Sequence, residues 1–154
     1  RKAVALLEIL VNKQVQQTTQ EKQANTSSTS QTLFNLKLLA YERIILFIER
    51  IKPDSFIPRT LSPSLPYQEY QLLLINEIRK EFEYNLSQQL YLSENAWEVT
   101  VNFKDNIITL INSAATSCPP QATASDLARK ILEHYISSDL KGDQISKIVK
   151  AEIQ

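Results

Sequence analysis

Apolar residues recur along this chain at the spacing of α-helices, most clearly in the stretch from Pro66 to Leu92. At about 100° per residue, one face of this stretch collects an apolar stripe wide enough to face a core. Two amides, Asn85 and Gln89, fall within the stripe. An unpartnered amide in a dry interior costs about 1–3 kcal/mol. We therefore predict that both amides are buried and hydrogen-bonded outside their own helix, or that the stripe is open to a partner at that end. The apolar members of the stripe are Tyr67, Leu74, Ile75, Ile78, Phe82, Leu86 and Leu92.

The stretch from Leu33 to Ile51 predicts a second helix, whose polar face repeats every seven residues. The doublets Glu42-Arg43 and Glu49-Arg50 form this repeat, and apolar residues cover well over half of the circumference. A helix with so wide an apolar arc is expected to be buried on several sides. Lys52-Pro53 should end it, because the residue before a proline is pushed out of helical angles.

The two Glu-Arg doublets allow two interpretations. One is a solvated face with ordinary surface ion pairs. The other is a polar seam between helices, which Leu39 and Leu46 favour because they lie among the charges. Such a seam would specify helix register and would not be catalytic. We predict that the seam consists of Glu42, Arg43, Glu49, Arg50, Asn85, Gln88 and Gln89.

Residues 1–31 predict a separate N-terminal unit. Ala3 to about Gln17 has the spacing of an amphipathic helix, whereas Gln14 to Gln31 is rich in Gln, Thr, Ser and Asn. A tract this polar cannot bury enough surface to offset its ordering entropy, so it is a linker or a frayed helical stalk. Residues 32–154 then form the main domain.

The connection from Asp54 to Leu65 is proline-rich and is expected to be extended, with Phe56 and Ile57 holding it to the core. Ser64 is a plausible N-cap for the central helix. Ser93 predicts a new N-cap, which begins a helix that continues to Cys118. The alternation at 99–103 is typical of a strand, but a lone short strand without a partner is the weaker interpretation.

Two more helices complete the chain. Thr123 and Asp126 resemble a capping box at the start of a helix that reaches about Ser138. A last short helix is expected from Asp143 to Ile153, with Ile145, Ile148, Val149 and Ile153 inward. The fold class is therefore all-α: an irregular antiparallel bundle of about five helices, preceded by an N-terminal helix or stalk.

The composition argues against a nucleic-acid partner. Hydrophobic residues make up 43% of the 154 residues, and 17 basic residues balance 17 acidic ones. A chain without net charge has no overall attraction to nucleic acid, and no basic cluster interleaved with aromatic residues is present. We therefore expect no nucleic-acid partner.

The chain has few residues of the types that carry out catalysis or bind metals. His134 is the only histidine and Cys118 the only cysteine, so these residue types cannot supply a zinc set. His134 is most simply a packed or surface residue, and Cys118 a small apolar filler. The single glycine argues against a phosphate-binding loop. We expect no cofactor and no metal.

The N-terminus suggests attachment to a membrane. The chain begins Arg1-Lys2 and contains no methionine, so a segment before Arg1 is expected to be missing. Two basic residues ahead of an apolar helix resemble the cytoplasmic flank of a membrane span, and an ordinary helix cut at its start is the alternative. An upstream anchor would place the domain on the cytoplasmic side of the inner membrane.

Three strings carry a family resemblance: LLAYERIILFIERIKP at Leu38–Pro53, EFEYNLSQQLYLSENAW at Glu81–Trp97, and LIN at Leu110–Asn112. Over about Leu38 to Ile153 the chain resembles a small bacterial family of hypothetical proteins of unknown function. The resemblance implies one N-terminal membrane-spanning helix, a short basic stalk and then this helical domain. The stalk departs from that pattern, since it is longer and richer in Gln and Ser. The family offers no catalytic residues to carry over.

The sequence thus predicts a non-catalytic binding or scaffold domain of a membrane-anchored bacterial protein, acting through protein contacts in a larger assembly. One alternative is a soluble homo-oligomer held through the helix Leu33–Ile51. Another is an enzyme that uses Glu42, Arg43, Glu83 and Asn85 on an acidic or amide substrate. A deep polar pocket would favour the enzyme, and an exposed apolar patch would favour binding. The predicted interface consists of Leu39, Leu46, Arg59, Tyr84 and Tyr91.

Overall fold

The computed structural model describes residues 2–140 and 142–153, with side chains for 4–16, 26–140 and 146–152. Within these residues every regular element is a helix, and the one β-bridge joins Pro66 to Thr123. The all-α class is therefore confirmed. The elements are α1 (Lys2–Ile51), α2 (Pro53–Thr60), α3 (Tyr67–Tyr84), the 3₁₀ helix η1 (Leu86–Tyr91), α4 (Glu94–Thr116), α5 (Ala124–Ser137) and α6 (Gly142–Ile153).

The chain divides into two compact units, Arg1–Lys37 and Leu38–Gln154. The boundary lies a few residues after the predicted one, and residues 14–31 are helical, so a non-helical linker is wrong. This stretch contains no Gly or Pro, and Gln, Lys and Ala are adequate helix formers, so nothing in it breaks α1. In unit 1 the apolar side chains of Val4, Leu7, Val11 and Val15 are exposed.

Limited proteolysis is expected to cut between residues 16 and 31 and to leave a stable fragment that begins near Leu38. The physical reason is that the described apolar side chains of residues 4–15 are exposed, so this helix gains little from burial within its own unit. Mass spectrometry of the fragment and its thermal melt test this. If removing residues 1–37 abolished the cooperative melting transition, the separation into two units would be wrong.

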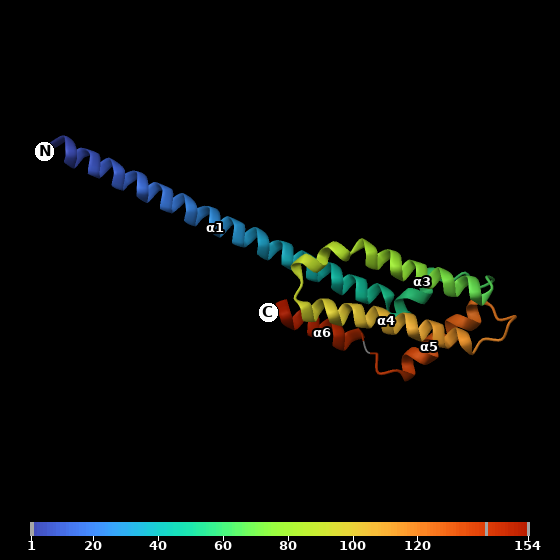
Figure 1. The fold of residues 1–154 in the computed structure, drawn as a ribbon. Helices are drawn as coiled ribbons and strands as arrows, with labels where there is room; N and C mark the ends of the chain where they lie inside the picture. Colours follow the sequence, from blue (N-terminus) through green and yellow to red (C-terminus); the bar gives the residue numbers. More distant parts are fainter. Residues whose placement is uncertain (1, 141, 154) are drawn as a thin grey trace. The chain divides into compact units, whose positions relative to one another are not determined.

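The core of unit 2 lies between helices that alternate in direction: residues 38–51 of α1, then α3, then α4 (Figure 1). α5 packs against α3 and α4, and α6 packs against α4. The expectation that residues 33–51 are buried on several sides is confirmed for the C-terminal half of that stretch. The largest buried side chains include Ile44, Phe47, Ile48 and Ile51 of α1, Tyr70, Leu74 and Ile78 of α3, Phe103, Ile107 and Ile111 of α4, and Leu127 of α5.

The central stretch is shorter as an α-helix than its pattern predicts. α3 begins at Tyr67 with Pro66, not Ser64, in the N-cap position, and it ends at Tyr84. Asn85 then leaves helical geometry, at φ −101° and ψ 4°, and η1 follows. A 3₁₀ helix has about three residues per turn, so the predicted stripe loses its register after Tyr84. Leu86 is exposed for this reason.

The connection after α1 is also different from the prediction. The predicted extended segment begins with α2, where Pro53 takes a first-turn position that tolerates its missing N–H. Phe56 and Ile57 are buried, as expected. Lys52-Pro53 does end α1, which confirms that boundary.

The two predicted helix starts in the C-terminal half are confirmed. Ser93 Oγ accepts a hydrogen bond from the Ala96 N–H at 3.0 Å, at the start of α4. The Thr123 N–H donates to Asp126 Oδ2 at 3.0 Å at the start of α5, and this bond lowers the pKa of Asp126. Residues 99–103 are helical within α4.

The face that α6 presents to the bundle differs in part from the prediction. Val149 is buried as expected, whereas Ile148 is exposed. Ile148 and Val149 are adjacent, and consecutive residues point about 100° apart on a helix, so a narrow contact buries only one of them. The side chains of Ile145 and Ile153 lie outside the described residues.

Candidate interaction groove

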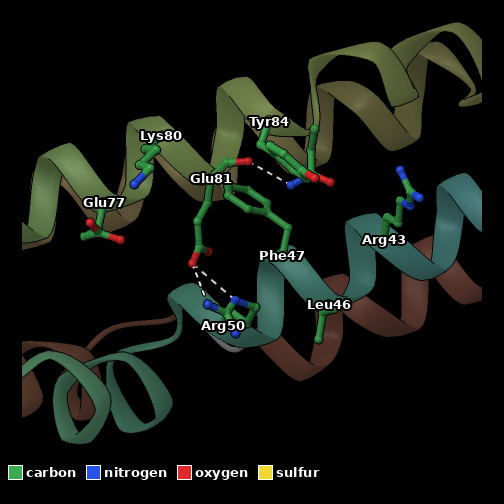
Figure 2. Close-up of a pocket in the computed structure, with 9 residues that line it drawn as sticks. Arg43, Leu46, Phe47, Arg50, Glu77, Lys80, Glu81 and Tyr84 are labelled. Atoms are coloured by element: carbon green, nitrogen blue, oxygen red, sulfur yellow. Dashed lines mark hydrogen bonds and ion pairs between the residues drawn. The ribbon is translucent and has the colours of Figure 1, made fainter.

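A groove of about 540 Å³ runs between residues 43–50 of α1 and residues 77–85 around the end of α3 (Figure 2). Both walls belong to unit 2. We call it the α1/α3 groove. Its lining combines apolar, cationic and anionic side chains: Arg43, Leu46, Phe47, Arg50, Glu77, Lys80, Glu81, Tyr84 and Asn85.

A carboxylate held by two arginines joins the walls at one end of the groove. Glu81 Oε1 accepts from Arg50 Nη2 at 2.8 Å, from Arg50 Nε at 3.2 Å and from Arg59 Nη1 at 3.3 Å. Arg59 Nη2 also donates to the Arg50 carbonyl oxygen at 2.8 Å, near the end of α1. The bond to Glu81 raises the pKa of Arg50. These contacts fix α1, α2 and α3 to one another.

The other oxygen of this carboxylate, Glu81 Oε2, is buried and has no hydrogen-bond partner among the described residues. The side chain as a whole is only 18% exposed. A buried carboxylate of this kind is tolerated because its first oxygen is so fully paired. Glu81 is thus a structural anion.

Aromatic rings lie beneath the groove. Phe82 of α3 is 6.0 Å from the Phe47 ring of α1 and 5.3 Å from the Trp97 ring of α4, measured between centroids. The Phe82 and Trp97 planes differ by 24°, which is close to a stacked geometry. Lys104 Nζ lies 4.1 Å from the Phe82 centroid, within cation–π range. Phe82 therefore connects three helices.

The rim of the groove is apolar and open. Leu46 of α1 is 59% exposed and Tyr84 of α3 is 84% exposed. Arg43 and Lys80 stand on the two walls, and neither makes a hydrogen bond or ion pair with any residue whose side chain is described. Figure 2 shows Arg43 and Leu46 on the α1 ribbon and Lys80 and Tyr84 on the α3 ribbon.

The predicted polar seam does not form as one cluster. Arg50 turns to Glu81 on α3, whereas Glu49 accepts from Lys52 Nζ at 2.9 Å and from Ser146 Oγ of α6 at 3.2 Å. Lys52, predicted only as the end of a helix, is buried in this second cluster. Neighbouring residues on a helix diverge by about 100°, so a Glu-Arg doublet serves two different interfaces. Glu42 and Arg43 are exposed.

The amide prediction is wrong in its details. Asn85 Nδ2 donates to the Glu81 carbonyl at 2.8 Å, one turn back on its own helix, and Gln89 is exposed. Gln88 is the buried amide, because the 3₁₀ turns of η1 rotate a different residue inward. The residues proposed for an enzyme also do not converge, since Glu42 and Glu83 are exposed and neither lines the groove.

The predicted interface residues differ in exposure and in the contacts that they make. Leu39, Leu46 and Tyr84 are exposed. Tyr91 is half-buried, and the Arg59 guanidinium is occupied by Glu81 and the Arg50 carbonyl. Arg59 therefore has a structural role in place of the predicted partner contact.

A second hollow, of about 700 Å³, lies between α4 and α5 and contains His134 with Glu133, Ser113 and Ser137. Within the described side chains His134 has no hydrogen-bond partner, and the Ser137 hydroxyl donates to the Glu133 carbonyl. This arrangement lacks the paired nucleophile and base that acyl-transfer chemistry needs.

The described residues contain neither a metal-binding cluster nor a membrane-spanning helix. Among them no three His, Cys, Asp or Glu side chains gather closely enough to hold a metal ion. None of the helices, as far as they are described, has an apolar stretch long enough to cross a bilayer.

The comparisons with known proteins bear on the family of the chain. Neither a curated protein nor a solved structure matches it. The predicted membership of a family of unknown function is confirmed. Residues 2–154 match the family described as "Family of unknown function (DUF7935)", and the chain belongs to this family.

Proposed function

We propose that this chain is a non-catalytic protein-binding module of a membrane-anchored assembly, and that it binds a partner polypeptide along the α1/α3 groove. The single observation that supports binding is the exposure of Leu46 and Tyr84 on facing walls of an open groove. Large apolar side chains gathered on one face of a folded domain are typical of interaction sites. The anchoring part rests on the resemblance of residues 38–53 and 81–97 to proteins with an N-terminal membrane helix.

Binding is a better account of this groove than catalysis. The Glu81 carboxylate that joins its two walls is committed to Arg50 and Arg59 and is not available as a general acid or base. The groove is shallow enough for Tyr84 to be largely in solvent. Enzyme sites usually enclose most of a small substrate, which an open groove of this kind does not do.

The lining also indicates what kind of polypeptide fits. Grooves between two helices commonly accept a third, amphipathic helix that lays its apolar face on the rim residues. Tyr84 is an aromatic side chain with a polar tip, a residue type enriched among interface hot spots. Arg43 and Lys80, one on each wall, would favour a partner that carries carboxylates next to its apolar face.

The proposal is tested by site-specific photo-crosslinking of the full chain in its own cells. A photoreactive phenylalanine analogue at Tyr84 is expected to yield a protein adduct. The same analogue at Ile136, which is 81% exposed on α5, serves as the matched control. Mass spectrometry of the crosslinked peptide identifies the partner.

The second arm uses two leucines of similar exposure. Leu46→Glu is expected to reduce the Tyr84 adduct about fivefold or more, because it places a charge on the apolar rim. Leu72→Glu, at a position 61% exposed on α3 that does not line the groove, should leave the adduct unchanged. Equal adducts at Tyr84 and Ile136, or an adduct indifferent to Leu46→Glu, would contradict binding at this groove.

A further inference from the structure

We infer that the partner is a second copy of this chain. The two copies pack the outer faces of their α1 helices against each other, and the two helices run parallel. The inference rests on the proposed function, because this face adjoins the α1/α3 groove through Leu46. We define the α1 outer face as Leu39, Glu42, Arg43 and Leu46, all of which are exposed.

The α1 outer face has an apolar centre and charged edges of opposite sign. Leu39 and Leu46 are seven residues apart and therefore nearly aligned along the helix. Relative to Leu39, Glu42 is rotated by about 60° in one sense and Arg43 by about 40° in the other, from 100° per residue. The apolar line thus separates an anionic edge from a cationic edge.

This distribution of charge discriminates between the two symmetric ways of pairing the face with itself. A two-fold axis parallel to the helices brings the anionic edge of one copy to the cationic edge of the other, at nearly the same height. A two-fold axis perpendicular to the helices brings Glu42 to the partner's Glu42, and Arg43 to the partner's Arg43. Like charges in contact are unfavourable, so only the parallel pairing is self-complementary.

The two charges needed for this pairing are uncommitted. Glu42 and Arg43 form no hydrogen bond or ion pair with the side chains described here, whereas both residues of the next doublet, Glu49 and Arg50, are paired within unit 2. Neither Arg43 nor Glu42 is needed to hold unit 2 together. A parallel dimer would therefore gain two Glu42–Arg43 pairs without breaking an internal one.

The apolar part of the surface extends beyond α1. Leu46 and Arg43 also line the α1/α3 groove, whose far wall carries Tyr84. The surface is thus larger than a pair of isolated leucines, as a stable contact requires.

Sedimentation equilibrium of the full chain at low ionic strength tests the charge pattern. The wild type is expected to dimerise. Glu42→Arg and Arg43→Glu should each weaken the dimer about tenfold, because both ion pairs become repulsive. The double variant should recover wild-type association, and so should an equimolar mixture of the two single variants. Leu46→Glu should abolish the dimer, whereas Leu72→Glu should not change it.

Disulfide trapping tests the direction of the helices. In a parallel pair, Leu39→Cys alone and Leu46→Cys alone should each give a covalent dimer on oxidation. In an antiparallel pair, only a mixture of the two variants would do so, which would overturn the parallel arrangement. Cys118 is buried, so the wild-type chain is the control.

Two results would overturn the inference. One is a chain that remains monomeric at all concentrations, and the other is a dimer insensitive to Leu46→Glu and to both charge reversals. If the Tyr84 photo-adduct then contains a different protein, the proposed binding function stands and only the identity of the partner is wrong. If no adduct forms either, both proposals fail.

Discussion

Replacing Phe82 by alanine is expected to lower the free energy of unfolding of the bundle by about 3 kcal/mol. Truncating a buried phenylalanine typically costs about 3–5 kcal/mol, and the lower end applies because Phe82 is only partly buried. The ring contacts Phe47 on α1 and Trp97 on α4, so one substitution weakens the packing among three helices. It also removes the surface over which the Lys104 ammonium lies.

Urea denaturation followed by far-ultraviolet circular dichroism measures this effect. The wild type and the variants must be compared at a protein concentration at which none of them self-associates, because self-association would add to the apparent stability. Tyr84→Ala is the matched control: an aromatic side chain two residues further along α3, but 84% exposed, so its loss should change the stability by less than about 0.5 kcal/mol. Equal losses in both variants would show that the aromatic cluster is not the junction described here.

The same pair of variants separates stability from binding. Phe47 lines the α1/α3 groove from below and is held by Phe82, so Phe82→Ala should disturb the groove as well as the core. Tyr84→Ala should reduce association while leaving the fold intact. A reduction in association that appeared only in Phe82→Ala would mean that the rim of the groove is not a contact surface.

Features that depend on one helix at a time could be predicted from the sequence. The apolar arc of residues 44–51 predicted burial on several sides, because a wide apolar stripe is stable only when neighbouring elements shield it from water. The caps at Ser93 and Thr123 were predictable because each is a local exchange of hydrogen bonds within a few residues. Lys52-Pro53 ended α1 for steric reasons that are equally local.

The end of α3 was not predictable in this way. Gln88 is buried and Gln89 is exposed because the chain switches to a 3₁₀ helix after Asn85. Both helix types accept this sequence, and the packing of neighbouring elements selects between them. Asn85 and Gln89 would both lie inward only on one unbroken helix, and a small change in residues per turn alters which amide is buried.

The ion-pair network at the groove was missed because its members are far apart in the sequence. Glu81 is 31 residues from Arg50 and 22 residues from Arg59 in the sequence, and no periodicity links these positions. One signal was present: Glu81 precedes Phe82 and follows Ile78 by three residues, at the edge of the apolar stripe. A carboxylate at that edge is partly desolvated and needs a cation. The choice among the available arginines needed the fold.

Among the described side chains of α6, Val149 and two polar clusters attach it to the rest of unit 2. Val149 is fully buried, and Ser146 donates to Glu49 of α1. Glu152 accepts from the Ser93 hydroxyl, from Asn95 Nδ2 at 2.6 Å and from the Tyr41 hydroxyl at 3.4 Å. The hydrogen bond from Ser93 is the largest cause of a lowered pKa at Glu152, so this carboxylate remains an acceptor at neutral pH.

Val149→Asp is therefore expected to release α6 from unit 2 and to lower stability by about 2–4 kcal/mol, because placing a charge in a fully buried site is costly. The loss is limited by the free energy that docks α6, since undocking lets the new carboxylate reach water while α3, α4 and α5 stay packed. Hydrogen exchange should show lost protection at residues 146–152 and retained protection in α4. Ile148→Asp, at the adjacent exposed position, should change neither the stability nor the hydrogen-exchange protection.

If both variants behave alike, α6 is not docked through Val149. If Val149→Asp instead removes protection throughout the bundle, α6 unfolds together with the core and is part of the same cooperative unit.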